Sequence, residues 1–369
     1  MYRLRTAPFR TRIAFDASLA TIRYVLEHGG SAVLCSHLGR PKGRQVELSL
    51  KPVAHYLSGQ LGIEIPLAPD SVGEAVDSMT ASLTPGQAIL LENLRYRAEE
   101  EANDPTFARA LAHGKSVYVN DAFGTAHRAH ASTVGVVRFI AEKAAGLLMT
   151  RELQALRTVT RNPARPYVLI MGGAKVSDKI GVLRNMIPKV DTILIGGAMA
   201  YTFLKARGVG IGKSRFEAEK LAIAQELSKE AERAGVFLLL PVDHVMANNS
   251  NQEAIGEVVS SIPADKIGLD IGPRTIAEFS ARLKAAKTIV WNGPLGFFEV
   301  PAFATGTLKV GEAVALSGAT SVLAGGDTEA AVANQDWAGR FSHISTGGGA
   351  ALEFLEGRTL PGLLALEEP

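Results

Sequence analysis

Apolar and polar positions follow two alternating patterns along the chain. Short apolar, β-branched runs without charged residues predict strands that are buried on both faces. These runs are Ala32–Cys35, Ala88–Leu91, Val117–Val119, Tyr167–Ile170, Ile193–Ile195, Phe237–Leu240, Thr288–Trp291 and Ser321–Leu323. Longer stretches with helical periodicity lie between them, at Asp16–His28, Lys51–Leu61, Pro105–Ala112, Phe216–Ala234 and Thr275–Ala286. This alternation predicts an α/β fold with doubly wound parallel sheets.

One further helical pattern marks a change of domain. Ala144–Arg157 reads as a helix, and the segment Arg161–Pro166 that follows it interrupts the alternation of strand and helix. A chain of 369 residues is longer than one hydrophobic core usually organises and is suited to two domains. We therefore place the domain boundary around this helix.

Basic residues follow three predicted strands in the first half of the chain. Ser36–Pro41, which contains His37 and Arg40, follows the first strand, whereas Arg95 and Arg128 follow the next two. Ligands of parallel sheets bind at the carboxyl ends of the strands, so we expect these four side chains to point into one crevice. Arginine forks suit carboxylate and phosphate oxygens. The group therefore predicts an anion site.

Glycine-rich turns follow the strands of the second half. They are Gly172–Lys179, Gly196–Ala198, Asn292–Gly296, Gly325–Thr328 and Thr346–Ala350. Glycines let the backbone approach phosphates, and the N-termini of helices attract anions. Lys175 and Lys179 add positive charge to the first turn. The repeated pattern predicts a nucleotide site, in which Asp327 is placed as a ligand for phosphate-bound Mg²⁺.

Composition argues against several other classes of protein. The net charge of +2 lacks the excess of basic residues that a dedicated nucleic-acid binder usually carries. The one cysteine, Cys35, cannot form an internal disulfide, and we expect it to be a buried strand residue. His127 and His130 have no nearby carboxylate or thiol to complete a metal site, so we expect ordinary hydrogen-bonding roles. No apolar run is long enough for a signal peptide or a membrane span, which favours a cytoplasmic enzyme.

Two other nucleotide-binding motifs, the P-loop and the dinucleotide fingerprint, fit the glycine-rich segments less well. Gly208–Ser214 ends like a P-loop, but Arg207 occupies the position of its first glycine. We therefore expect a surface loop there. A dehydrogenase is disfavoured because Gly172–Lys175 lacks the glycine spacing of the dinucleotide fingerprint.

From about Thr21 to its end, the chain resembles the phosphoglycerate kinase family. The resemblance rests on motifs that occur in the family's order. They are Ser36–Pro41, Leu91–Arg95, Tyr118–Gly135, Gly172–Gly181, Trp291–Gly296, Gly325–Thr328 and Ser342–Gly357. Several motifs run for ten or more residues, which makes the match specific.

The resemblance implies a fold, a reaction and a set of ligands. The fold is two Rossmann-like lobes joined by a hinge helix, with residues 1–150 and 346–369 forming the lobe that binds 3-phosphoglycerate. Residues 151–345 form the nucleotide-binding lobe. The reaction is the reversible transfer of a phosphoryl group between 1,3-bisphosphoglycerate with ADP and 3-phosphoglycerate with ATP, with Mg²⁺, in glycolysis. The resemblance also implies a monomer without nucleic-acid or membrane partners.

The same resemblance assigns roles to individual residues. The acid would be held by His37, Leu38, Gly39, Arg40, Arg95 and Arg128. The nucleotide would be held by Gly172, Gly173, Lys175, Lys179, Gly268, Asn292, Pro294, Glu299, Gly325, Gly326, Asp327 and Thr328. Glu299 would bond the ribose, and Asp327 would bind the metal. Catalytic groups would be Lys175 and the backbone amides of Gly347, Gly348 and Gly349.

The start of the chain departs from the family pattern. The family begins with a strand that carries an arginine, an aspartate and an asparagine for the acid, and no such run occurs here. The family's catalytic arginine aligns with Ala14 without gaps, or with Arg12 after a two-residue insertion. Ala198 and Ala324 replace usual glycines. Two hypotheses follow: an active kinase, or a truncated, non-catalytic relative that only binds nucleotide.

Overall fold

The structure, a computed structural model, describes the backbone of residues 9–367 and the side chains from Asp16 to Glu367. The chain divides into two compact units. The first comprises Met1–Glu152 and Thr359–Pro369, and the second comprises Leu153–Arg358. Within the described residues, no helix is long and apolar enough to cross a bilayer.

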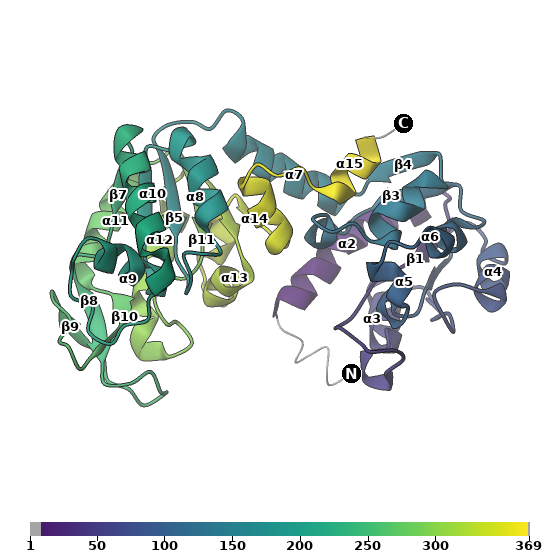
Figure 1. Cartoon of the computed structure of the whole chain (residues 1–369). Coiled ribbons are helices and arrows are strands. Elements are labelled where there is room, and N and C mark those ends of the chain that lie inside the picture. The colour runs from purple at the N-terminus through teal and green to yellow at the C-terminus, as the bar shows by residue number, and fades with distance from the viewer. Residues whose placement is uncertain (1–8, 368–369) are drawn as a thin grey trace. The chain divides into compact units, whose positions relative to one another are not determined.

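The first unit contains two pairs of parallel strands. β1 (Ala32–Leu34) pairs with β2 (Ala88–Leu90), and β3 (Val117–Asn120) pairs with β4 (Glu142–Ala145). Its helices are α2 (Phe9–Glu27), α3 (Lys51–Leu61), α4 (Glu74–Ala81), α5 (Ala98–Glu101), α6 (Pro105–Ala112) and α15 (Pro361–Glu367). α15 comes from the end of the chain and lies beside β4 (Figure 1). The C-terminal residues therefore help to build the first unit.

Local sequence explains where some of these helices start. α6 begins at Pro105, whose missing N–H has no helical partner to lose at that position. The Asp104 side chain accepts a hydrogen bond from the Phe107 backbone N–H at 2.8 Å, which caps the helix. α7 (Leu147–Thr160) is capped similarly, because Asp121 Oδ1 accepts from the Met149 N–H at 2.9 Å.

The second unit is organised around a six-stranded parallel sheet in the order β13-β12-β11-β5-β6-β7. Its strands are β5 (Tyr167–Met171), β6 (Thr192–Ile195), β7 (Phe237–Leu239), β11 (Thr288–Asn292), β12 (Thr320–Ala324) and β13 (His343–Ile344). Every residue of β5, β6 and β11 is buried. These central strands are therefore covered on both faces, as their apolar sequences predict.

The helices of the second unit connect these strands. They are α8 (Ile180–Met186), α9 (Gly197–Ala206), α10 (Leu221–Arg233), α11 (Pro273–Ala285), α12 (Thr305–Leu316), α13 (Gly326–Val332) and α14 (Gly349–Leu355). Phe279 and Leu283 of α11 and Val310 and Val314 of α12 pack against alternate residues of the sheet. The parallel sheet with connecting helices (Figure 1) confirms the predicted α/β class.

A second, smaller sheet was not predicted. β8 (His244–Ala247), β9 (Glu257–Val259) and β10 (Ile267–Ile271) pair antiparallel in the order β10-β8-β9. β8 and β9 are only four and three residues long, and β10 is interrupted by Gly268 and Asp270. Their sequences therefore lack the longer apolar run that marks the central strands. β10 also carries a register shift between Gly268 and Asp270.

Three predictions about the first unit are wrong. Val117 and Val119 of β3 are exposed, although this strand was predicted to be buried on both faces. The helix predicted from Ala144 begins only at Leu147, because Glu142–Ala145 pairs with β3 as a strand. Cys35 is exposed and lies beyond the end of β1. The three residues of β1 are only half-buried, so this strand is not covered on both faces, and the residue after it is open to solvent.

The boundary of the returning C-terminal segment also differs from the expected residue 346. α14 packs on α8, so the second unit continues to Arg358 and the first resumes at Thr359. The predicted division after residue 150 falls two residues before the observed one.

Candidate functional site

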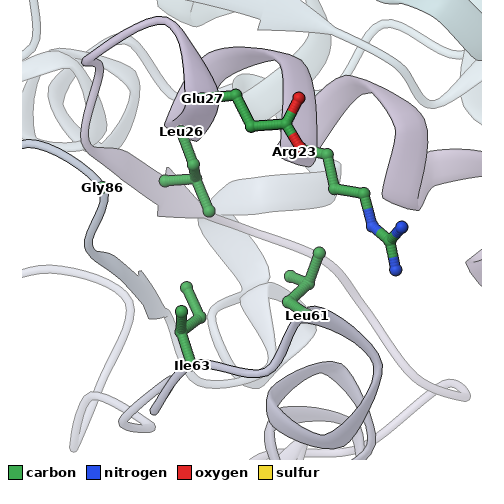
Figure 2. A pocket seen from close by; sticks show the side chains of 6 residues that line it. All are labelled: Arg23, Leu26, Glu27, Leu61, Ile63 and Gly86. Atoms are coloured by element: carbon green, nitrogen blue, oxygen red, sulfur yellow. The ribbon is translucent and has the colours of Figure 1, made fainter.

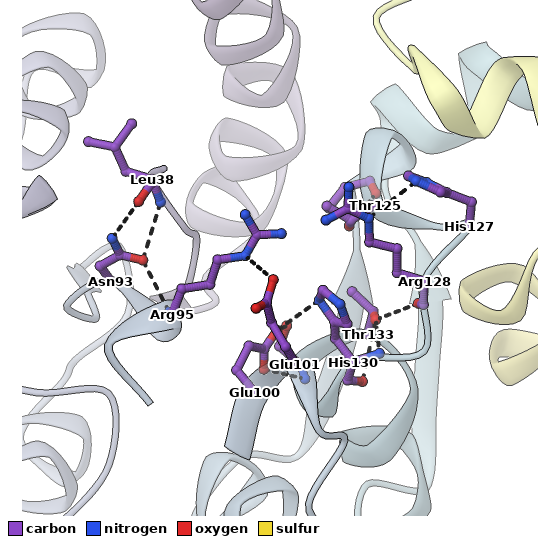
Figure 3. Close-up of polar contacts among 12 residues, drawn as sticks. Leu38, Asn93, Arg95, Glu100, Glu101, Thr125, His127, Arg128, His130 and Thr133 are labelled. Atoms are coloured by element: carbon purple, nitrogen blue, oxygen red, sulfur yellow. Dashed lines mark hydrogen bonds and ion pairs between the residues drawn. The ribbon is translucent and has the colours of Figure 1, made fainter. Parts of the chain in front are cut away.

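The loops after β1 and β2 are tied together in the first unit. Asn93 Nδ2 donates to the Leu38 carbonyl oxygen at 2.8 Å, and the Leu38 N–H donates back to Asn93 Oδ1 at 3.2 Å (Figure 3). The same oxygen accepts from the Arg95 N–H at 3.1 Å. Asn93 therefore fixes two of the strand-end segments that carry predicted acid-binding residues, a role that we did not predict from the sequence.

Arg95 lies buried at this edge, with 8% of its surface exposed. Its Nη1 donates to the Gly39 carbonyl oxygen at 2.8 Å, and its Nε lies 3.1 Å from Glu101 Oε1. Within the described residues, its buried Nη2 has no hydrogen-bond partner. A guanidinium with a free donor in this position is suited to an incoming anion.

The charges of other predicted basic residues act on Arg95 and His37. Burial lowers the pKa of Arg95, and the nearby charges of Arg128 and Arg40 lower it further. Burial, followed by the charges of Arg95, His130 and Arg128, lowers the pKa of His37 to about 4. His37 is therefore neutral near pH 7 and serves as a hydrogen-bonding group, while the arginines carry the positive charge.

Two glutamates that the sequence reading missed support this cluster. Glu101 pairs with Arg95, as described above. Glu100 is buried and accepts from the Ser132 N–H at 3.0 Å and the Ser132 hydroxyl at 2.5 Å. His130 Nδ1 lies 3.8 Å from Glu100 Oε1 (Figure 3). The sequence does not indicate these roles, because both glutamates lie in a run of acidic residues that is ordinary for a helix.

The histidines after β3 make polar contacts within the protein. Arg128 Nε donates to His127 Nε2 at 3.2 Å, and His130 lies beside Glu100. Within the described residues, no group of three or more His, Cys, Asp or Glu side chains could hold a metal ion. Both histidines thus contact polar groups of the protein, and Glu100 is a carboxylate neighbour of His130 that the sequence did not indicate.

The glycine-rich loops of the second unit interlock because β5, β11 and β12 are neighbours in the sheet. The Gly172 N–H donates to the Asn292 carbonyl oxygen at 2.9 Å, and the Gly173 N–H donates to the Pro294 carbonyl oxygen at 2.7 Å. A Cβ atom on Gly172 would lie 2.2 Å from the Pro294 oxygen. Glycine is therefore required for the close approach of these two loops.

The loop after β12 joins the same assembly. Asn292 Nδ2 donates to the Ala324 carbonyl oxygen at 2.7 Å, and the Gly293 N–H donates to Thr328 Oγ1 at 2.7 Å. Lys179 Nζ donates to Asn292 Oδ1. Burial lowers the pKa of Lys179, against the opposing effect of nearby Asp178 and Asp327. The structure thus brings three of the predicted nucleotide-binding segments together at one end of the sheet.

Thr307 holds the loop that follows β11, and Asp270 holds the start of α12. Thr307 Oγ1 accepts from the Leu295 N–H at 2.9 Å and the Gly296 N–H at 3.2 Å. Asp270 Oδ2 accepts from the Gly306 N–H at 2.7 Å, at the start of α12. Burial raises the pKa of Asp270 to about 7. Both residues were missed in the sequence, because their partners lie in other elements.

The remaining predicted residues lie in several segments of the second unit. The Phe297 N–H donates to the Leu269 carbonyl oxygen at 2.8 Å, which joins the loop that contains Glu299 to the strand that contains Gly268. Glu299 and Lys175 are exposed. Gly347 and Gly348 are buried just before α14, and Gly349 is its first residue.

Asp327 is suited to bind a metal ion that is also coordinated by phosphate oxygens. It is exposed in the first turn of α13, next to Gly326. Mg²⁺ in nucleotide sites commonly takes one or two carboxylates together with phosphate oxygens and water. A single exposed carboxylate beside a glycine-rich turn fits that requirement.

The pocket shown in Figure 2 lies elsewhere in the first unit. It is lined by Arg23, Leu26, Glu27, Leu61, Ile63 and Gly86. None of these residues was predicted to bind substrate or nucleotide. Arg23 is also engaged, because its Nη2 donates to the Gln60 carbonyl oxygen at 2.7 Å.

Comparisons with known proteins agree along nearly the whole chain. The family model described as phosphoglycerate kinase matches residues 9–358. A phosphoglycerate kinase of Koribacter versatilis is 54% identical over 361 residues, which cover 95% of this chain and 89% of the relative. The phosphoglycerate kinase structure from Coxiella burnetii has a TM-score of 0.87 at 41% identity, covering 95% of this chain and 89% of that one. The Pyrococcus horikoshii structure has a TM-score of 0.81 at 33% identity, covering 96% and 90%.

Proposed function

Because the chain belongs to the phosphoglycerate kinase family, we propose that it transfers a phosphoryl group reversibly between 1,3-bisphosphoglycerate with ADP and 3-phosphoglycerate with ATP. The observation that carries the proposal is the pairing of two kinds of site in one chain. Within the described part of the first unit, buried Arg95 keeps a donor free for an anion and feels the charges of Arg40 and Arg128. In the second unit, glycine-rich loops interlock at one end of the sheet.

The hypothesis of a non-catalytic relative is not supported. The family match runs from residue 9 to residue 358. Relatives named phosphoglycerate kinase align with 95% of the chain at about half identity. Arg12 and Ala14, the two candidates for the family's catalytic arginine, both fall in α2, and their side chains lie outside those that the structure describes.

We assign recognition of the acid to the first unit. Arg40, Arg95 and Arg128 would bind the carboxylate and phosphate oxygens of 3-phosphoglycerate, since guanidinium forks match both groups. His37 would act as a neutral hydrogen-bonding group, in keeping with its lowered pKa. Leu38 and Gly39 would border the site, with their backbone held by Asn93 and Arg95. The free donor on Nη2 of Arg95 supports this assignment most directly.

We assign nucleotide binding to the second unit. Gly172, Gly173, Lys179, Asn292, Pro294, Gly325, Gly326 and Thr328 would surround the phosphates, with Gly268 and Glu299 toward the nucleoside. Glu299 would bond the ribose. Asp327 would hold Mg²⁺, which when bound would neutralise charge on the phosphates.

The chemistry itself needs positioning and charge neutralisation more than covalent help. Lys175 would place its ammonium against the transferring group. The backbone N–H groups of Gly347–Gly349 would stabilise the same oxygens. Transfer also requires that the two ligands meet with water excluded, since the acyl phosphate is otherwise open to hydrolysis. Hinge closure is therefore part of the proposal.

Location and assembly follow the family. We propose a cytoplasmic monomer that takes part in glycolysis. A wheat relative that is 49% identical over 357 residues is named as a cytosolic phosphoglycerate kinase.

Calorimetric titration of the purified chain tests this assignment. Mg-ADP and 3-phosphoglycerate are titrated separately, and the Arg95→Ala variant serves as the control for the acid. Binding of both ligands by the wild type, with loss of acid binding alone in the variant, is expected. Binding of Mg-ADP without any binding of 3-phosphoglycerate would contradict the assignment of the first unit.

A further inference from the structure

The turn that carries Lys175 is held by a carboxylate from a distant part of the chain. Glu217 Oε2 accepts from the Ser177 N–H at 3.0 Å, and Glu217 Oε1 accepts from the Ser177 hydroxyl at 2.6 Å. These bonds fix the backbone immediately after Lys175, although Glu217 lies 40 residues beyond Ser177.

Glu217 is itself anchored to a buried part of the second unit. Its N–H donates to Thr202 Oγ1 at 3.0 Å, and Thr202 is fully buried in α9. The first turn of α9 bonds in turn to the loop after β5, because the Met199 N–H donates to the Gly173 carbonyl oxygen at 3.0 Å. The segment from Gly173 to Ser177 is therefore tied to α9 at both of its ends.

The charge of Glu217 also faces Lys175. Partial burial raises the pKa of Glu217, but the two hydrogen bonds from Ser177, together with the charge of Lys175, outweigh it, so that the pKa lies below its ordinary value. Glu217 is therefore ionised at neutral pH. Lys175 is exposed while its neighbour Val176 is fully buried, so the backbone is firmly placed where the side chain leaves it.

We propose that Glu217 is a positioning residue for Lys175. Glu217 holds the turn so that the Lys175 ammonium reaches the transferring phosphoryl group. The inference rests on the catalytic role given to Lys175 in the proposed function. Glu217 acts through the backbone N–H and the hydroxyl of Ser177, and no contact with either substrate is needed. A misplacement of about 1 Å can cost a reaction about 100-fold when geometry is the main source of catalysis.

The first test compares Glu217→Ala with Glu219→Ala in the complete chain. Glu219 is an exposed glutamate two residues further along, so its removal changes net charge equally without touching the turn. Glu217→Ala is expected to lower kcat about 10- to 100-fold, with the KM for ADP changed less than about threefold. Glu217→Gln keeps one acceptor and should recover part of the loss. A kcat in Glu217→Ala equal to that in Glu219→Ala would overturn the inference.

A double-mutant cycle separates positioning from a general loss of structure. If Glu217 acts through Lys175, Glu217→Ala lowers kcat little or not at all in a Lys175→Ala background. Additive losses would overturn the inference. If Glu217→Ala does not fold, Ser177→Ala takes its place in the cycle, because it removes only the hydrogen bond from the Ser177 hydroxyl to Glu217. An unchanged kcat in Lys175→Ala alone would instead reject the proposed role of Lys175, so the two failures are distinguishable.

Discussion

Asp270 offers a quantitative test of the packing beneath the candidate nucleotide site. Its carboxylate is 2% exposed and accepts from the backbone N–H groups of Gly306 and Ile271, at 2.7 and 2.9 Å. Neither group carries a positive charge, so burial raises the pKa of Asp270 from 3.8 to about 7. The perturbation is Asp270→Asn, which keeps the size of the side chain and removes its titration.

The sign of the effect follows from proton binding. Between pH 3.8 and about pH 7 the folded protein keeps a proton on Asp270 that the unfolded chain releases. The contribution of Asp270 to the free energy of unfolding is therefore fully present below pH 3.8. It is lost progressively as the pH rises from there to above about 7. Each pH unit is worth ~1.4 kcal/mol, so about two units between pH 5 and pH 7 give up to about 3 kcal/mol.

The assay is urea-induced unfolding of the wild type and Asp270→Asn at about pH 5 and pH 8. Other titrating groups contribute equally to both proteins and cancel in the difference between them. The wild type should lose about 2–3 kcal/mol more than the variant between the two pH values. Equal pH dependence in the two proteins, within about 0.5 kcal/mol, would refute the reasoning.

Three further predictions concern the proposed site. Lys175→Ala should lower kcat by at least about 100-fold while Mg-ADP binds with nearly unchanged affinity in calorimetry; an unchanged kcat would reject the assignment. Gly172→Ala places a Cβ atom 2.2 Å from the Pro294 oxygen and should weaken Mg-ADP binding at least about 10-fold. The control is Gly210→Ala, because a Cβ there meets nothing within 4 Å; equal affinities in both variants would contradict the close approach of the loops. Arg95→Ala should raise the KM for 3-phosphoglycerate about 10- to 100-fold and leave the KM for ATP unchanged, whereas parallel changes in both constants would point to a general structural defect.

The fold was predictable where one segment carries its own signals. α3 and α6 have the predicted bounds, since each has a proline in its first turn and α6 also has the capping Asp104. β5 was recognised because its residues are uniformly apolar. β4 was missed because its sequence, Glu-Lys-Ala-Ala, carries two charges and its alanines continue into a helical pattern.

The candidate site was predictable only in part, for a related reason. Arg95 and Lys175 stand directly after predicted strands, where the topology of a parallel sheet places ligands. Asn93 and Glu217 were missed because their roles depend on bonds to residues 55 and 40 positions away. Such partners are set by tertiary packing, and no periodicity or spacing in one sequence reveals them.

The most direct test of the central claim is turnover by the purified chain. Mg-ATP and 3-phosphoglycerate are supplied together and ADP formation is followed, with each substrate omitted in turn and Lys175→Ala as the control. We expect ADP formation that requires both substrates and falls at least about 100-fold in the variant. Binding of Mg-ATP without any ADP formation that depends on 3-phosphoglycerate would contradict the account.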